Sequence, residues 1–280
     1  PADFVLWKPS ASSLPGWDSP WGRGRPGWHI ECSAMAAAHL VATIDIHGGG
    51  NDLKFPHHEN EIAQSRCAHG NEVFARYWLH NGFVQMDKEK MSKSLGNILL
   101  VEQLVAQFPG EAVRLALLKA KYREPLNWDK SLIQQAKAQL DRLYGALERL
   151  DEIAIDKPVA HPDFLQAMDD DLNTPAAIAV LMEVANDANK AVNDNEKHTL
   201  KSQLLAGGLE LGLFAKSPGE RFAYDPSGNV DKTLVESLIE ERNRARAGKD
   251  WQRADQVRDE LAAMGVQIKD SPNGTEWRIE

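Results

Sequence analysis

A thiol, an imidazole and a carboxylate occur in one polar stretch near the start of the chain. They belong to Cys32, His57 and Glu61. Thiolate sulfur, imidazole nitrogen and carboxylate oxygen are the donor types with which proteins hold zinc. On a helix, His57 and Glu61 would share a face, because they are four positions apart. The spacing predicts a zinc site, although such a pair also forms plain surface hydrogen bonds.

The flanking sequence predicts the elements that carry these groups. Alanines after Cys32 favour a helix that begins near it, where the helix dipole would favour the thiolate. A lone cysteine is also compatible with a small buried apolar residue. Pro56 fits the first turn of a second helix, over 56–69. Cys67 faces another side of that helix, so a fourth ligand would come from outside this chain or from a substrate atom.

A strand-like run over 42–47 leads directly into three glycines. We predict a buried strand, followed by a loop in which the backbone of Gly49 and Gly50 can come close to a ligand. Asp52 would stand at the mouth of this loop and accept a hydrogen bond from an amine or a ribose hydroxyl. A triple glycine taken alone is weak support for such a site.

Two lysines, Lys90 and Lys93, lie in a serine- and glycine-containing loop after an apolar segment over 81–86. Ammonium groups in such a loop can neutralise the charge that builds up on a transferring phosphoryl group. Without context, the same run is typical of a solvated turn.

Composition limits the class of protein. With 280 residues, 42% of them hydrophobic, the chain can form a sizeable core in two or three domains. Two cysteines are too few for a disulfide framework, and no leader or long apolar run is visible, so we expect a cytoplasmic, soluble protein with no membrane partner. The net charge of -9 argues against indiscriminate nucleic-acid binding but allows a local basic face.

Beyond Gly96 the pattern becomes helical. Amphipathic spacing predicts helices over 99–108, 111–121, 131–151, 173–192 and 196–214. Prolines and glycines predict a linker over 215–229. After it we predict helices over 231–247 and 251–264, and a β-hairpin of 266–270 and 275–279.

Arginines gather in this last part of an otherwise acidic chain. Arginine planes and exposed aromatic rings suit splayed single-stranded bases. Neighbouring acidic residues would equally make these arginines part of a salt-bridged helix surface. The candidate RNA-binding residues are Arg242, Arg244, Arg246, Arg253 and Trp277.

Several of these motifs resemble a known family. Lys90-Met91-Ser92-Lys93-Ser94 is similar to the signature loop of the class I aminoacyl-tRNA synthetases, and the segments 27–35 and 55–61 resemble those of the cysteinyl-tRNA synthetases in particular. The likeness runs from Asp3 to Arg278. It implies an α/β fold: the second half of a Rossmann-type catalytic domain over 1–97, a helical domain over 98–214, the linker over 215–229, and a small α+β anticodon-binding domain over 230–280.

The resemblance also implies a reaction, the ATP-dependent ligation of L-cysteine to tRNA(Cys) through a cysteinyl-adenylate. It implies one zinc ion per chain, held by Cys32, His57 and Glu61 and binding the substrate thiolate, and ATP used with Mg2+. Trp28 would wall the amino-acid pocket. Asp52 would hold the ammonium group or, with Gly49 and Gly50, the nucleotide. Lys90 and Lys93 would stabilise the departing pyrophosphate.

The family's second zinc-binding cysteine and its His-Ile-Gly-His signature do not occur here. The chain opens at Pro1 with a strand-like run and no initiator Met, so we expect the N-terminal half of the same enzyme as a partner, and an inactive chain without it. The complete enzyme is expected to be a monomer. The alternatives are a non-catalytic fragment that binds zinc and tRNA, a ligase that joins cysteine to an amino sugar, and a plain zinc-dependent hydrolase.

Overall fold

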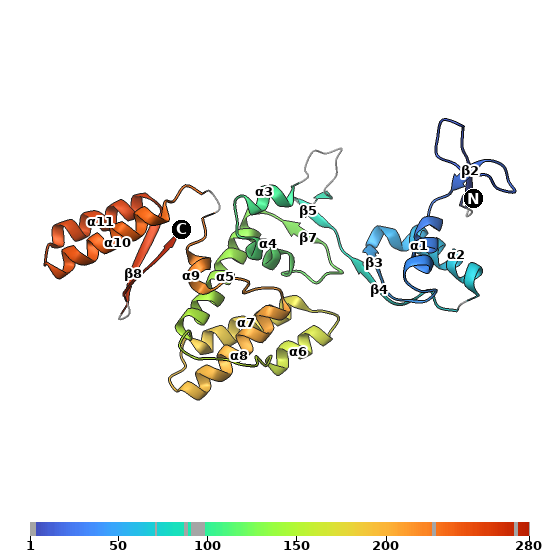
Figure 1. Ribbon diagram of the computed structural model, residues 1–280. Helices are drawn as coiled ribbons and strands as arrows, with labels where there is room; N and C mark the ends of the chain where they lie inside the picture. Colours follow the sequence, from blue (N-terminus) through green and yellow to red (C-terminus); the bar gives the residue numbers. More distant parts are fainter. Residues whose placement is uncertain are drawn as a thin grey trace. The chain divides into compact units, whose positions relative to one another are not determined.

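The chain forms two compact units (Figure 1). The computed structural model describes residues 4–70, 72–86, 89–90, 99–225, 228–271 and 274–279. The first unit comprises Pro1–Val84 and Tyr122–Leu126, and the second comprises Gln85–Lys121 and Asn127–Glu280. Among the described residues, no helix combines the length and the apolar character needed to cross a membrane.

A parallel pair of strands with two helices beside it organises the first unit. The strands are β3 (Ile44–Gly50) and β4 (Ala75–Asn81), and the helices are α1 (Ile30–His39) and α2 (Glu59–His69). Ile44, Phe74 and Ala75 form a small buried core, and Ala36, Ile62 and Trp78 pack against it, so both helices contribute to one centre. A short antiparallel hairpin, β1 (Trp7–Pro9) with β2 (Gly24–Pro26), precedes α1.

Two predicted features of this unit differ from the structure. The predicted strand is present as β3, but only Ile44 in it is buried, because in the described part of the chain β3 pairs with β4 alone. The α-helix begins at Glu59 and not at Pro56. Two short helical turns, η1 (Asn51–Leu53) and the π-type η2 (Lys54–His58), come first, and Phe55 has extended backbone angles inside the second.

The second unit contains a small sheet and a helical bundle. The sheet has the order β6 (Glu89–Lys90), β5 (Val84–Met86), β7 (Leu126–Trp128). The helices after it are α3 (Val101–Val105), α4 (Gly110–Leu117), α5 (Lys130–Arg149), α6 (Pro162–Asp169), α7 (Thr174–Ala188) and α8 (Asp194–Glu210). All of these except α6, which was not predicted, lie close to the predicted ranges, and the side chains of Asp129, Asn173 and Asn193 cap α5, α7 and α8.

Helix α5 is the central element of the bundle. It buries Ile133, Ala136, Leu140, Leu143 and Leu147 along one stripe, as its amphipathic spacing predicts. Fully burying each of the large side chains contributes about 1.5–3 kcal/mol. The stripe therefore holds α5 firmly against its neighbours, and its opposite face stays available for polar contacts.

The segment predicted as a linker contains a short helix, α9 (Pro218–Phe222). Ser217 caps it in a reciprocal capping box with Glu220, and Pro218 stands at the start of the helix, where the missing N–H costs nothing. Arg221 and Phe222 are buried, and Arg221 donates to Asp141 on α5. Proline and glycine here begin a helix and do not leave the chain extended.

The C-terminal part contains α10 (Lys232–Ala247), α11 (Trp251–Ala263) and the antiparallel hairpin of β8 (Val266–Ser271) and β9 (Gly274–Ile279). Val235, Val257, Leu261 and Val266 form its core, and Trp277 packs against them. Both predicted helices and the predicted hairpin are confirmed.

Candidate functional site

Glu61 is a buried carboxylate at the centre of the first unit. Its side chain is 6% exposed, and its Oε2 atom lies 3.0 Å from Nε2 of His47 on β3. The thiol of Cys32 on α1 also interacts with this carboxylate. Oε2 is close to His47 in distance, yet it has no partner with hydrogen-bond geometry in the described structure. Three elements thus bring a sulfur, a nitrogen and an oxygen together.

The surroundings keep Glu61 ionised. Burial by itself raises the pKa of a carboxyl group, but the adjacent His47 ring, the charge of His58 and the Cys32 thiol outweigh it and lower the pKa of Glu61. A buried carboxylate without a full set of hydrogen bonds is costly for the fold. Such a group is suited to a positively charged ligand.

Two histidines complete the group around Glu61. His47, His58 and Glu61 each offer one ligand atom, and these atoms lie within 4.8 Å of one another. His58 is buried, and its Nδ1 atom lies 2.8 Å from Nε2 of His80 on β4. Burial, and then the charge of His47, lower the pKa of His58, which favours the neutral ring that a metal requires. These three residues could hold a metal ion.

His57 stands apart from that close group. Its ring lies 4.9 Å from the His29 ring and 5.5 Å from the Trp28 ring, measured between centroids. His57 lies in the short turn that precedes α2, four positions before Glu61, and it is not among the three residues whose ligand atoms lie within 4.8 Å of one another. Of the predicted zinc ligands, the structure brings Cys32 to Glu61 and leaves His57 beside Trp28.

The surroundings of Cys32 do not favour the thiolate that its place on the helix predicts. Loss of water around the sulfur, and then the negative charge of Glu61, raise the pKa of Cys32, although the residue as a whole is exposed. The thiol does lie in the first turn of α1. Desolvation, and then a carboxylate that is distant in sequence, therefore decide the direction of the shift in the pKa of Cys32.

His29 is a residue that the sequence gave no reason to select. It caps α1 with a left-handed backbone conformation, φ 73°, which is uncommon for a non-glycine residue. Its ring is buried, and its Nδ1 atom has no hydrogen-bond partner in the described part of the chain. Burial, followed by the charge of His57, lowers the pKa of His29. Strained backbone and an unpaired ring nitrogen are typical of a functional site.

The glycines after the predicted strand lie inside β3, close to other side chains of the chain. Gly49 and Gly50 belong to β3, and a Cβ on Gly49 would lie 2.9 Å from Cε1 of His58, so this glycine makes room for a ring of the protein. Asp52 is exposed, and its carboxylate lies against Gly50. Trp28 is 75% exposed. The roles predicted for these residues in ligand binding remain predictions.

The lysine loop lies at the edge of the described structure. The backbone of Lys90 pairs with Gln85 in the β5–β6 hairpin, and nothing is described of its side chain. Lys93 lies outside the described residues.

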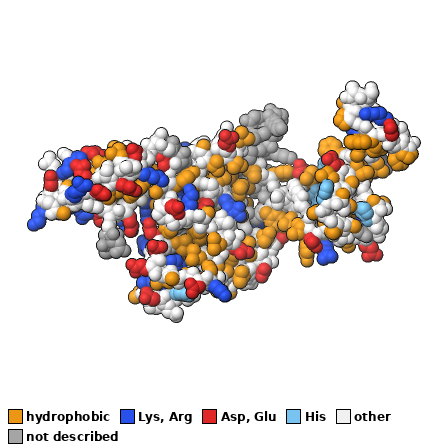
Figure 2. Space-filling view, in the orientation of Figure 1, with side chains coloured by type: hydrophobic (Ala, Val, Ile, Leu, Met, Phe, Trp, Pro, Cys, Tyr) orange, Lys and Arg blue, Asp and Glu red, His pale blue; other side chains and the backbone are white. Residues whose placement is uncertain are grey.

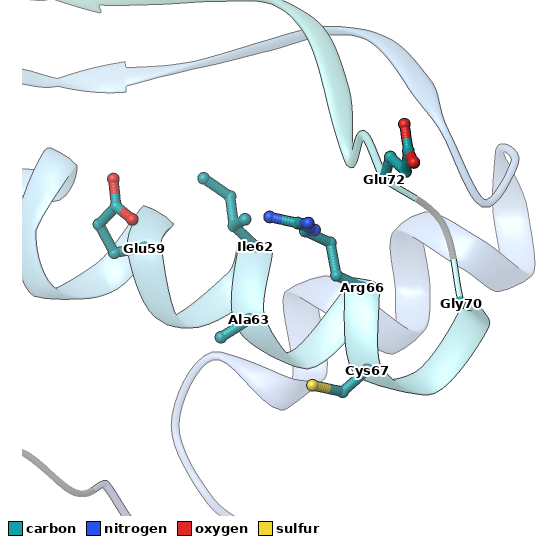
Figure 3. Close-up of a pocket in the computed structure, with 7 residues that line it drawn as sticks. All are labelled: Glu59, Ile62, Ala63, Arg66, Cys67, Gly70 and Glu72. Carbon is teal, nitrogen blue, oxygen red and sulfur yellow. The ribbon is translucent and has the colours of Figure 1, made fainter.

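A cavity of about 530 Å³ opens on another face of α2 (Figure 3). Glu59, Ile62, Ala63, Arg66, Cys67, Gly70 and Glu72 line it. The helical positions among these follow a spacing of three and four, whereas His58, Glu61 and Ser65 follow another stripe of the same helix. This cavity is separate from the cluster around Glu61.

Most of the candidate RNA-binding arginines form ion pairs within the chain. Arg242 is buried and donates two hydrogen bonds to Asp270, at 2.8 and 2.9 Å, and Arg246 pairs with the same carboxylate. Arg253 pairs with Glu241 and Glu260, and Arg244 pairs with Glu240. Blue and red side chains are interspersed over α10 and α11 in Figure 2. These arginines therefore fit the alternative of a salt-bridged helix surface better than that of a free RNA-binding surface. Trp277 packs against the hydrophobic core.

The comparisons with known proteins agree with this architecture. Residues 1–138 match the family model of the tRNA synthetases class I (C) catalytic domain, residues 163–215 match the DALR domain, and residues 233–278 match the cysteinyl-tRNA ligase anticodon binding domain. The Agrobacterium radiobacter K84 LeuRS, in a ternary complex with tRNA and LeuAMS, has a TM-score of 0.53 at 16% identity, over 91% of this chain and 42% of that chain. That likeness concerns the fold alone.

These matches place the chain among the class I tRNA synthetases. The cysteine–tRNA ligase of Parvibaculum lavamentivorans is 58% identical, over 100% of this chain and 60% of that protein, and that of Maricaulis maris is 54% identical, over 99% and 60%. The chain belongs to the cysteine–tRNA ligase family. It spans about 60% of the length of these curated relatives.

Replacing Arg242 by alanine should destabilise the C-terminal part. The change leaves Asp270 without its bidentate partner, and we expect a loss of about 2–3 kcal/mol, because this pair is only partly buried. The protection of the backbone amides of α10, α11 and the hairpin against hydrogen exchange measures this loss of stability. Arg244→Ala, which breaks an exposed pair, should cost less than about 1 kcal/mol. Equal protection in both variants would contradict a structural role for Arg242.

This contribution should depend on pH. Arg242 holds the pKa of Asp270 below its usual range. Stability from the pair is therefore present above the pKa of an unfolded aspartate and is lost as the pH falls through the lower, folded-state pKa. The difference between wild type and Arg242→Ala should shrink in acid.

Removing the charge of Glu61 should make Cys32 more reactive in metal-free protein. The carboxylate raises the pKa of the thiol, so Glu61→Gln should increase the thiolate fraction and the rate of alkylation by iodoacetamide at pH 8. A Cys67→Ser background isolates the signal of Cys32. An unchanged or lower rate in Glu61→Gln would contradict the contact between the two residues.

Proposed function

We propose that this chain takes part in the ATP-dependent ligation of L-cysteine to tRNA(Cys), through a cysteinyl-adenylate formed from ATP with Mg2+. The main support for this proposal is the ionised Glu61 carboxylate, which is buried next to the Cys32 thiol in a chain of the cysteine–tRNA ligase family. A thiol-selecting site requires donors of these types. The chain supplies part of the active site, in line with its 60% coverage of the relatives.

The residues around Glu61 fit a zinc ion. Oε2 of Glu61 and Nδ1 of His29 are buried polar atoms without hydrogen-bond partners in the described structure, and imidazole, thiol and carboxylate donors surround them. We propose Cys32, His57 and Glu61 as the ligands. A competing set uses His47 and His58 with the same Glu61. Bound zinc would supply a soft acid that prefers the thiolate of cysteine to the hydroxyl of serine.

Other residues of the chain would bind and orient the substrates. Trp28, exposed beside His57, would wall the amino-acid pocket. Asp52, exposed after β3, would accept hydrogen bonds from the substrate ammonium group or the ATP ribose, next to Gly49 and Gly50. Lys90 and Lys93 would neutralise the pyrophosphate as it leaves.

The C-terminal helices and hairpin would bind tRNA(Cys). The match of residues 233–278 to an anticodon binding domain supports this and disfavours ligation to an amino sugar, which has no anticodon. Because Arg242, Arg246 and Arg253 are ion-paired within the chain, their guanidinium groups would contribute to RNA binding mainly by holding the domain in shape.

Zinc content tests the ligand set. Inductively coupled plasma mass spectrometry of the purified chain should find about one zinc in the wild type and a loss in Cys32→Ser, His57→Gln and Glu61→Gln, since each change removes one donor. Cys67→Ser should keep its zinc. Loss in His47→Gln and His58→Gln with retention in His57→Gln would favour the competing set. Full retention in a folded Glu61→Gln protein would contradict both.

Pyrophosphate exchange tests the lysine loop. In the enzyme that carries this chain, Lys93→Ala should lower cysteine-dependent ATP–pyrophosphate exchange by about 10² to 10³, because a preorganised charge on the leaving group is lost. Lys90→Ala should have a smaller effect, and Lys157→Ala, at an exposed loop position, should have none. An unaffected rate in Lys93→Ala would favour the hydrolase alternative.

A further inference from the structure

A crevice of about 300 Å³ lies on one face of α5, beside the C-terminal hairpin. Positions 141, 142, 145, 148 and 149 of α5 line it, and their spacing puts them on a single face of the helix. Lys269 of β8, Arg278 of β9 and Asn189 after α7 complete the lining. The lining residues of the crevice thus come from both the helical bundle and the C-terminal part of the second unit.

The two carboxylates of the crevice are already neutralised. Asp141 accepts from Arg221 of α9, and Lys137 lies 3.3 Å from its other oxygen. Glu148 accepts from Arg278, whose guanidinium also lies over the Phe222 ring, 3.9 Å from its centroid. These acidic groups therefore do not compensate the remaining cations.

Three cations of the crevice have no acidic partner. Among the residues that the structure describes, no carboxylate lies within ion-pair distance of Arg142, Arg149 or Lys269, and all three are exposed. Arg142 donates to a neutral group, the amide oxygen of Asn186, at 3.2 Å. The crevice is a local concentration of positive charge in a chain whose net charge is -9.

The floor of the crevice is a glycine in the interior of a helix. Gly145 lies in the last half of the 20-residue α5, where alanine would be more favourable for the helix. Nothing in the described structure lies within 4 Å of the position that a Cβ would take there. No packing contact of the chain therefore explains this half-buried glycine, and the open space at its Cβ position leaves room for a ligand.

We propose that this crevice binds phosphodiester groups of the tRNA backbone through Arg142, Arg149 and Lys269. The inference rests on the proposed function, since it takes tRNA as the partner. The three cations are exposed and distributed over two elements, which suits the extended charge of a polynucleotide better than one small anion. Lys269 lies within the segment that matches an anticodon binding domain. Contacts of this kind fix the register of the RNA without reading its sequence.

Binding of a fluorescent tRNA(Cys) transcript to the 280-residue chain tests the proposal. The double variant Arg149→Gln/Lys269→Gln removes two unpaired charges and leaves polar side chains in their place. Fluorescence anisotropy should show affinity about tenfold weaker, and the slope of log affinity against log salt should decrease by about 1 to 2. Lys157→Gln/Lys197→Gln removes the same charge outside the crevice and should bind as the wild type does.

A second variant fills the space without changing the charge. Gly145→Gln should weaken tRNA binding severalfold, while the melting temperature stays the same or rises, because glutamine is the better helix former. Circular dichroism confirms the fold of every variant. Loss of affinity together with a lowered melting temperature would indicate a structural role for the glycine and would count against the proposal.

The outcomes separate this inference from the proposed function. If the wild type binds tRNA(Cys) and the crevice variants bind it equally well, the crevice has no role and the proposed function stands. If the wild type binds no tRNA, both fail. Inorganic phosphate and ATP are titrated in parallel. Variants that lose these small anions and keep tRNA would make the crevice a small-anion site and would overturn the proposal.

Discussion

The buried charge of Glu61 is the constraint on which the first unit depends. A carboxylate removed from water must be compensated within a few ångströms, and no single helix or strand provides that compensation. Here α1 contributes the Cys32 thiol and β3 contributes His47, so Glu61 links the elements whose apolar side chains also form the small core of Ile44, Phe74 and Ala75. The site and the fold of this unit share the same contacts.

The second unit uses charge in another way. Its arginines connect elements: Arg221 joins α9 to α5, Arg278 joins the hairpin to α5, and Arg242 joins α10 to β8. The planar, permanently charged guanidinium group is suited to such partly buried pairs, because it offers several donors in fixed directions. An acidic chain therefore commits many of its arginines to its own structure, and the few unpaired cations on α5 and β8 gain significance as contacts for a partner.

The sequence predicts the elements whose signals are local. The stripe of α5 and the pairing of β8 with β9 each depend on residues that lie close together in the sequence. The site depended on contacts that periodicity does not encode. His58 lies beside His80 of β4, and the α-helix begins at Glu59 and not at the predicted Pro56. Glu241, a partner of Arg253, is one of the neighbouring acids in the sequence, whereas Asp270, the partner of Arg242, lies 28 residues away and was not foreseen.

The direction in which the pKa of Cys32 is shifted indicates how the site would accommodate a cation. In the metal-free chain the pKa of the thiol is raised and that of Glu61 is lowered, so the proton resides on sulfur beside an ionised carboxylate. A soft cation that replaces this proton would convert both groups into ligands and balance the same buried charge, because metal binding to a thiol releases a proton. The electrostatics that disfavour a free thiolate at Cys32 are thus compatible with a metal-bound one. The raised pKa of Cys32 follows from burial of the sulfur and from the charge of Glu61, and it does not argue against a ligand role.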